Sequence, residues 1–181
     1  MADRVIVIPY DPEWARRFAE LGRRLRAALG DAALRIDHIG STAVVGLAAK
    51  PIIDVQISVA SFEPIDAYRL SLERLGYVFR AENPERTKRY FREPPGERRT
   101  HIHVRRAGSW AEQFSLLFRD YLRTHPEDAA RYADVKRALA RKHGEDRVGY
   151  TNAKTPFIWS VMMSADLWSQ EVGWTPGPSD A

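Results

Sequence analysis

Strict alternation of apolar and polar residues from Ile52 to Val59 predicts the central strand of the protein. Side chains on a strand repeat every second residue, so the apolar members of this run share one face. Asp54 and Gln56 lie on the opposite face. A loop of small residues around Gly40 separates this strand from an earlier alternating run that ends at Ile39. The pattern therefore predicts two connected strands, with a carboxylate on the polar face of the second.

Helical spacing of apolar residues predicts helices on both sides of this strand pair. One helix begins with Asp11 as its expected N-cap and Pro12 in its first position, and it ends at Gly30, where glycine is typical of a helix terminus. A second amphipathic helix is expected over Phe62–Leu75. Later helices begin near Trp110, at Pro126 and before Tyr150, with the Thr155-Pro156 pair as an alternative start of the last one. Shorter alternating runs predict further strands at Arg4–Ile8, Tyr77–Arg80, Thr87–Arg92 and Arg99–Arg105.

This order of elements predicts an α+β fold, in which a mixed sheet is flanked by helices. A chain of 181 residues is long enough to bury a substantial core, and no repeat or linker divides it. We expect a single domain over residues 1–172. Residues 173–181 are rich in proline, glycine and serine and are expected to form a flexible tail.

Composition narrows the class of protein. Apolar residues make up 44% and charged residues 29% of the chain, as in a soluble globular protein. The absence of cysteine excludes disulfides, thiolate metal ligands and a cysteine nucleophile. The first ten residues contain no apolar core typical of a secretory signal, and Phe157–Trp168 is too short to span a bilayer. We therefore expect a cytoplasmic protein without a membrane partner. The net charge of +4 favours polyanions only if it is concentrated on one face.

The strand Arg99–Arg105 brings further candidate chemistry to the polar face of the sheet. Its apolar residues point one way, and His101 and His103 point the other. Together with Asp54, this pair makes a two-histidine, one-carboxylate set suited to manganese, iron or zinc more than to magnesium. Alternatively, either imidazole could act as a general base or donate a hydrogen bond to phosphate. Two surface histidines would give the same pattern.

Several cations could contact a ligand that carries phosphate. Lys136 and Lys154 lie on the inward stripes of their predicted helices, and a buried ammonium needs water or an anion because its desolvation is costly. Lys50 lies at the mouth of the loop before the central strand. Lys88 and Arg99 belong to the predicted hairpin, where they could line a phosphate-binding groove. Each of these side chains could also be an ordinary surface charge.

Residues 38–59, HIGSTAVVGLAAKPIIDVQISV, resemble the signature of the GrpB family. That family is similar to the extra C-terminal domain of some dephospho-CoA kinases and belongs to the nucleotidyltransferase superfamily of the DNA polymerase beta type. The resemblance covers nearly the whole chain. Further matching motifs are PYDPxW at 9–14, HxHV at 101–104, FRDYLR at 118–123 and YxxxK at 150–154.

The resemblance implies a nucleotidyltransferase-like fold with a nucleotide site. In that superfamily a Gly-Ser pair at a helix start binds phosphate through backbone N–H groups, and two acids spaced by one residue on the next strand hold a divalent metal. Gly40 and Ser41 match the pair, although a tight turn would also explain them. Asp54 matches the first acid. Gln56 stands at the second acid position and departs from the pattern, because an amide oxygen is a neutral and weaker metal ligand.

Two functions follow from this sequence. The first is an enzyme that transfers a nucleotidyl group, or handles a nucleotide phosphate, with magnesium or manganese, or alternatively zinc, held by the catalytic residues Asp54, His101 and His103. The second is a non-catalytic domain that binds a nucleotide or a coenzyme A-like ligand and assists a partner protein. In both, the ligand is a nucleotide or a phosphorylated small molecule. Nucleic acid is less favoured, because no ladder of aromatic and basic residues stands out. No feature of the sequence sets the oligomeric state. The predicted phosphate-binding residues are Gly40, Ser41, Lys50, Gln56, Lys88, Arg99, Lys136 and Lys154.

Overall fold

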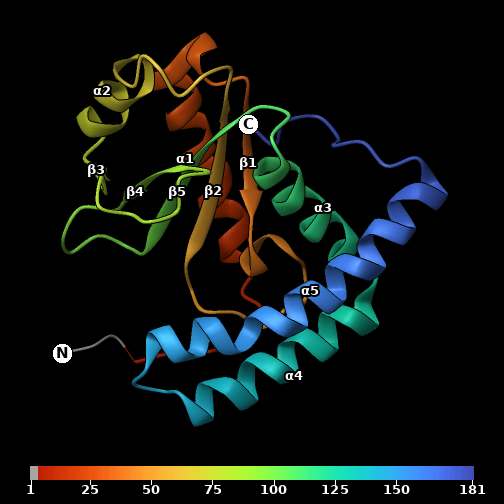
Figure 1. Cartoon of the computed structure of the whole chain (residues 1–181). Helices are drawn as coiled ribbons and strands as arrows, with labels where there is room; N and C mark the ends of the chain where they lie inside the picture. The colour runs from red at the N-terminus through yellow and green to blue at the C-terminus, as the bar shows by residue number, and fades with distance from the viewer. Residues whose placement is uncertain (1–3) are drawn as a thin grey trace.

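The computed structural model describes residues 4–181, which form a five-stranded mixed sheet with helices on both faces (Figure 1). This arrangement confirms the predicted α+β fold. The elements, in chain order, are α1 (Glu13–Leu29), the 3-10 turn η1 (Gly30–Ala32), β1 (Arg35–Ile39), the 3-10 turn η2 (Ser41–Ala43), β2 (Ile53–Val59), α2 (Asp66–Arg74), β3 (Val78–Phe79), β4 (Arg89–Arg92), β5 (Thr100–Arg106), α3 (Trp110–Thr124), α4 (Pro126–Lys142) and α5 (Arg147–Val172).

The strand order of the sheet is β1-β2-β5-β4-β3. β2 and β5 run parallel, and the other neighbouring strands are antiparallel. In the register of the parallel pair, Asp54 lies opposite His101 and Gln56 lies opposite His103. Residues separated by two positions on a strand share a face, so this register gathers the polar side chains of β2 and β5 on one side of the sheet.

The two faces of the sheet pack against different helices, as Figure 1 shows. The apolar face, including Val55 and Ile102, packs with α1 and α2 through large buried side chains such as Trp14 and Tyr68. Burying each such side chain contributes about 1.5–3 kcal/mol. α3 lies on the other face, and α4 and α5 pack against α3 beyond the end of the strands, where the three helices form a second core around Tyr132 with the loop that follows η2. The polar side of the sheet therefore faces this second helical layer.

The ends of the helices follow the sequence signals with two differences. The Asp11 carboxylate accepts a hydrogen bond from the Glu13 N–H at 2.9 Å, which is the capping contact expected from the sequence. α5 runs without interruption through Pro156, so the alternative start at that proline is wrong. The helix instead begins after Asp146, whose side chain accepts a bond from the Gly149 N–H. α2 is shorter than predicted and begins two residues after Pro64.

The N-terminal segment does not form the strand predicted over residues 4–8. Ile8 makes a single antiparallel bridge with Ala49, with backbone hydrogen bonds of 2.9 and 3.0 Å. The Val5 N–H donates to the Gly144 carbonyl oxygen at 2.8 Å. This segment is therefore held between the loop before β2 and the loop between α4 and α5.

The tail predicted to be flexible instead lies along β1. The Ala181 N–H donates to the Ile36 carbonyl oxygen at 3.1 Å, and the Ser179 hydroxyl bonds to both backbone groups of Ile36. Asp180 accepts a bond from the buried Arg119 guanidinium at 2.8 Å and another from the His38 N–H at 2.9 Å. These contacts cover the outer edge of β1. None of the helices in residues 4–181 is long and apolar enough to cross a membrane.

Candidate functional site

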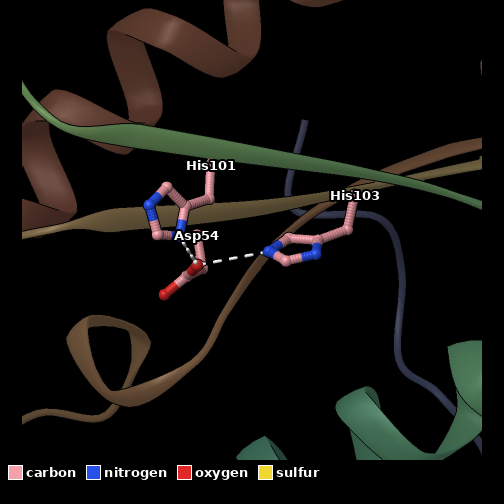
Figure 2. A group of neighbouring side chains, drawn as sticks. All are labelled: Asp54, His101 and His103. Atoms are coloured by element: carbon pink, nitrogen blue, oxygen red, sulfur yellow. Dashed lines mark hydrogen bonds and ion pairs between the residues drawn. The ribbon is translucent and has the colours of Figure 1, made fainter. Parts of the chain in front are cut away.

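One carboxylate and two imidazoles meet on the polar face of the sheet. Figure 2 shows His101 and His103 reaching toward Asp54 from the neighbouring strand. Ring N–H groups of the two histidines donate to the same oxygen, Asp54 Oδ1, from His101 Nδ1 at 3.1 Å and from His103 Nε2 at 3.2 Å. This contact follows from the register, because Asp54 lies directly opposite His101 and His103 follows it on the same face.

Burial and hydrogen bonding set the ionisation of Asp54 and His103. Burial opposes the charged form of Asp54, but hydrogen bonds from His101 and His103 outweigh burial and hold the pKa of this carboxyl well below its usual value. Burial lowers the pKa of His103 to about 4 despite the bond to Asp54, so its imidazole is neutral at pH 7. The site therefore presents an ionised carboxylate held by two N–H donors.

Gly40 leaves room for Oδ2 of Asp54, the carboxylate oxygen that the two histidines do not contact. Its φ of 72° is a left-handed conformation that favours glycine. A Cβ at this position would lie 2.8 Å from Asp54 Oδ2, which is too close for an ordinary contact. Glycine is therefore required at position 40 for two reasons, the left-handed backbone of the turn and the space that the Asp54 carboxylate occupies. Ser41 begins a single 3-10 turn, η2, in place of the longer helix that the family resemblance implies.

A cleft of about 510 Å³ opens above Asp54, His101 and His103. Its walls come from η2, the loop before β2, β4, α4 and α5. Among the described residues that line it, five are lysine or arginine and Asp54 is the single carboxylate. The five cations are Lys50, Lys88, Lys136, Arg147 and Lys154. Such an excess of positive charge in a concave surface attracts a polyanion.

Two of these lysines carry strongly perturbed pKa values. Lys136 is only 2% exposed, donates a hydrogen bond to the Ala48 carbonyl oxygen and lies 4.4 Å from the centre of the Tyr132 ring. Burial, reinforced by the charge of Lys154, lowers the pKa of Lys136 to about 6. The same two causes lower the pKa of Lys50 to about 8. The charge of Lys154 disfavours the protonated forms of Lys50 and Lys136, and a bound anion would offset that repulsion.

Most of the residues predicted for the site meet at this cleft. Ser41, Lys50, Lys88, Lys136 and Lys154 line it, with Asp54, His101 and His103 at its floor and Gly40 beneath the carboxylate. Two predicted residues do not line it, Gln56 and Arg99. Gln56 is fully buried below α3, where its amide donates to the Glu112 carbonyl oxygen at 3.3 Å. Arg99 lies 3.1 Å from Glu93 and lines a neighbouring hollow.

Arg147 and Thr151 line the cleft but were missed in the sequence. Together with Tyr150 and Lys154 they follow the spacing i, i+3, i+4, i+7, so they share one face of α5. That signal becomes visible once the last helix is taken to begin before Pro156. The helix start at Asp146 is what brings this guanidinium to the mouth of the cleft.

The donor atoms of Asp54, His101 and His103 lie within 4.8 Å of one another, so the three side chains could ligate one cation. A carboxylate with two imidazoles suits zinc, manganese or ferrous iron. The outer nitrogens, His101 Nε2 and His103 Nδ1, are buried without a hydrogen-bond partner among the described residues, whereas metal-bound histidines usually donate this second N–H.

The chain matches a family of known proteins over most of its length. The model of the GrpB protein family matches residues 4–164. The chain belongs to the GrpB family.

Relatives within and beyond this family differ in length. The chain is 43% identical over 164 residues to UPF0157 protein PA4798 of Pseudomonas aeruginosa, which covers 88% of this chain and 67% of that protein. It is 33% identical over 198 residues to a dephospho-CoA kinase of Mycolicibacterium paratuberculosis, which covers 95% of this chain and 48% of the kinase. The chain therefore spans about half the length of the kinases that it resembles.

Solved structures show the same fold. The crystal structure of the conserved protein GrpB from Enterococcus faecalis has a TM-score of 0.81 and 36% identity, covering 90% of this chain and 99% of that one. Cid1 poly(U) polymerase bound to MgATP has a TM-score of 0.51 and 10% identity, covering 74% of this chain and 43% of that one. The chain thus has the nucleotidyltransferase-like fold that the sequence resemblance implies.

Proposed function

We propose that the cleft binds a nucleotide or another ligand with a chain of phosphates, and that Asp54, His101 and His103 act at the phosphate nearest the sheet. The observation that carries this proposal is the placement of an ionised carboxylate, bonded to two imidazoles, at the floor of a cleft lined by five cations. Lysine and arginine are the usual protein partners of phosphate. A carboxylate repels phosphate, so a cleft that only bound anions would not be expected to contain one.

In the enzymatic form of this proposal, the protein transfers a nucleotidyl group. An acceptor hydroxyl oxygen forms a bond to the α-phosphorus while the bond to the β-phosphate oxygen breaks, so pyrophosphate leaves and the hydroxyl proton passes to solvent. Lys50, Lys136 and Lys154 hold the phosphate chain and balance the charge of the leaving group. A divalent cation bound by Asp54 and the two histidines would supply further stabilisation of charge on the transferred phosphoryl group.

A second candidate function is binding without catalysis. It is favoured by Gln56, which occupies the position of the usual second acid but is fully buried under α3 and so contributes no ligand at the cleft. The resemblance to about half of a dephospho-CoA kinase is consistent with a domain that assists a catalytic partner. In this form the cleft holds the ligand, and the low-pKa carboxylate keeps the two histidines in place.

Thermal shift and calorimetry with nucleoside triphosphates, each with magnesium, manganese, zinc or EDTA, test both forms. We expect nucleotides to raise the melting temperature, since a ligand at 100 times its Kd stabilises the native state by about 2.7 kcal/mol. Asp54→Asn should abolish metal-dependent release of pyrophosphate while the phosphate-binding lysines still hold the nucleotide. Asp31→Asn, at an exposed position in η1, is the matched control.

The outcomes separate the two functions. Pyrophosphate release that Asp54→Asn removes supports the enzyme, and nucleotide affinity without any product in the wild type supports the binding domain. Turnover that is unchanged in Asp54→Asn rejects the catalytic assignment. A protein that binds no nucleotide under any of these conditions contradicts both functions.

A further inference from the structure

The longest helix of the protein, α5, has apolar residues on two of its sides. One side is buried against α3 and α4, where Val161 and Met162 belong to the second core. On the opposite side, Trp159, Met163 and Leu167 are exposed. A helix that is apolar all round is normally buried on all sides, whereas a helix that covers a core has polar residues on its outer side. The outer side of α5 is therefore typical of a helix that contacts a second surface.

These exposed side chains form one continuous patch with two aromatic residues of α3. Phe114 lies between Trp110 and Trp159, with ring centres 5.7 Å and 5.5 Å away. From Trp159 the row continues through Met163 and Leu167 at steps of four residues, the spacing at which side chains on a helix are neighbours. We call these residues the outer patch: Trp110, Phe114, Trp159, Met163 and Leu167.

The size of the outer patch is close to what a small dimer interface requires. Its most exposed members are Trp110 at 66%, Trp159 at 49%, Met163 at 71% and Leu167 at 64%. With about 200 Å² of surface for each large apolar side chain, these four expose about 500 Å². Two copies of the patch would bury about 1,000 Å² in total, which is the lower limit for a specific protein interface.

The charge of this surface distinguishes between kinds of partner. Residues 155–170 contain one charged side chain, Asp166, and neither lysine nor arginine. Helices that lie on membranes usually carry lysine and arginine beside their apolar side, so an anionic bilayer would gain no attraction here. In a two-fold symmetric contact each charge lies near its own equivalent, and a surface almost free of charge avoids that repulsion. The charge pattern therefore favours a second copy of this chain.

The outer side of α5 is also complementary to itself in shape. Trp159, Met163 and Leu167 form a ridge of large side chains. Beside the ridge runs a second row with the same four-residue spacing, which contains the small exposed residues Ser160 and Ser164. Ridges of one helix pack into the grooves of another along rows of this spacing. Two copies related by a two-fold axis can each place their ridge over the serine row of the other.

From these observations we propose that the protein forms a two-fold symmetric dimer, in which the outer patches of two copies pack together and the α5 helices cross near Met163. Met163 is in the middle of the ridge, so the two copies of this side chain lie close to the axis. The interface is small, so we expect a dissociation constant in the micromolar range. The cleft stays open in the dimer, because Tyr150 and Lys154 line it from the other side of α5.

The test measures self-association by sedimentation equilibrium over about 1–200 µM protein, which brackets a micromolar dissociation constant. Met163→Glu and Met163→Lys each place two like charges at the axis and should raise the dissociation constant at least about tenfold. An equimolar mixture of the two variants, one of them labelled, brings opposite charges together and should restore a dimer within about threefold of wild-type affinity. Leu70→Lys, at an exposed position on α2, is the matched control and should dimerise like the wild type.

Each result supports the dimer or refutes it. Wild-type protein that stays monomeric at the highest concentration refutes it. A dimer that persists in both Met163 variants is formed by another surface, which refutes the outer patch. Loss in both variants, with circular dichroism spectra like the wild type and no recovery in the mixture, refutes the two-fold contact at Met163. Monomeric wild-type protein that sediments with phosphatidylglycerol vesicles, and no longer does so as Met163→Glu, would assign the patch to a membrane surface instead. The proposed nucleotide cleft does not depend on any of these outcomes.

Discussion

Binding of a phosphate chain should draw protons into the cleft. In the free protein the pKa of Lys136 is about 6 and that of Lys50 is about 8. At pH 7.5 Lys136 is then only about 3% protonated and Lys50 about three-quarters protonated. A bound anion favours the charged form of each lysine and restores its pKa toward the ordinary value. Binding of a nucleoside triphosphate at pH 7.5 should therefore be accompanied by uptake of about 1.2 protons, about 1.0 by Lys136 and about 0.2 by Lys50.

The sign of the pH dependence follows from this uptake. The complex holds more protons than the free protein, so affinity rises as the pH falls from 9 toward 6, by about tenfold per unit near pH 7.5. Calorimetry in buffers with different ionisation enthalpies measures the uptake directly, as the slope of the apparent binding enthalpy against the buffer enthalpy. Binding that takes up no proton at pH 7.5 would refute the assignment of Lys136 to the ligand site.

Lys136→Met separates the binding role of this lysine from its effect on folding. The variant should retain only the small uptake due to Lys50. The ordinary pKa of a lysine lies about three units above pH 7.5. Keeping the amine neutral at this pH therefore costs the native state about 4 kcal/mol, at about 1.36 kcal/mol for each unit. Removing the amine leaves the Ala48 carbonyl without its donor, a loss of about 1–3 kcal/mol. The variant should thus be more stable by about 1–3 kcal/mol in urea unfolding at pH 7.5, and lower stability with unchanged ligand binding would contradict this reasoning.

The remaining predictions concern the turn beneath the carboxylate and the tail. Gly46→Ala should cost about 1 kcal/mol, because Gly46 has a φ of 80° and open space around it, whereas Gly40→Ala should cost about 1–3 kcal/mol more, since its Cβ meets Asp54. Equal losses in urea unfolding would show that Asp54 moves aside freely. Asp180→Ala should cost about 1–3 kcal/mol by leaving the buried Arg119 with one bond fewer, and a variant as stable as wild type would show that the tail contributes nothing.

Strand faces were predictable from the sequence because the side-chain period on a strand is two. The alternation from Ile52 to Val59 and from Arg99 to Arg105 placed Asp54 and the two histidines on the polar side, and the register of β2 with β5 brings them together. Alternation does not reveal what covers a face. α3 lies more than fifty residues after Gln56 in sequence, and only its packing buries the amide.

The errors have local causes as well. Pro156 is a strong local signal for a helix boundary, but α5 already extends over two turns before it and continues, held by packing of Val161 and Met162 in the second core. The alternation of residues 4–8 resembles a strand, but only Ile8 finds a backbone partner of strand type. The composition of residues 173–181 suggests a flexible tail. Composition gives no information on tertiary contacts such as the one between Asp180 and Arg119.

The charge balance of the cleft explains how a site with one acid could still act on nucleotides. In a site with two acids, two metal-bound carboxylates would add negative charge next to the phosphates, so a metal would be needed for binding. Here the floor carries a single ionised carboxylate and a neutral His103, while four lysines and one arginine line the walls, and Lys136 becomes a cation when it takes up its proton on binding. The protein itself can therefore balance most of the charge of a triphosphate. Binding then depends on the lysines, whereas any chemistry depends on Asp54 and its two imidazoles, so substitutions in the two groups should affect affinity and turnover separately.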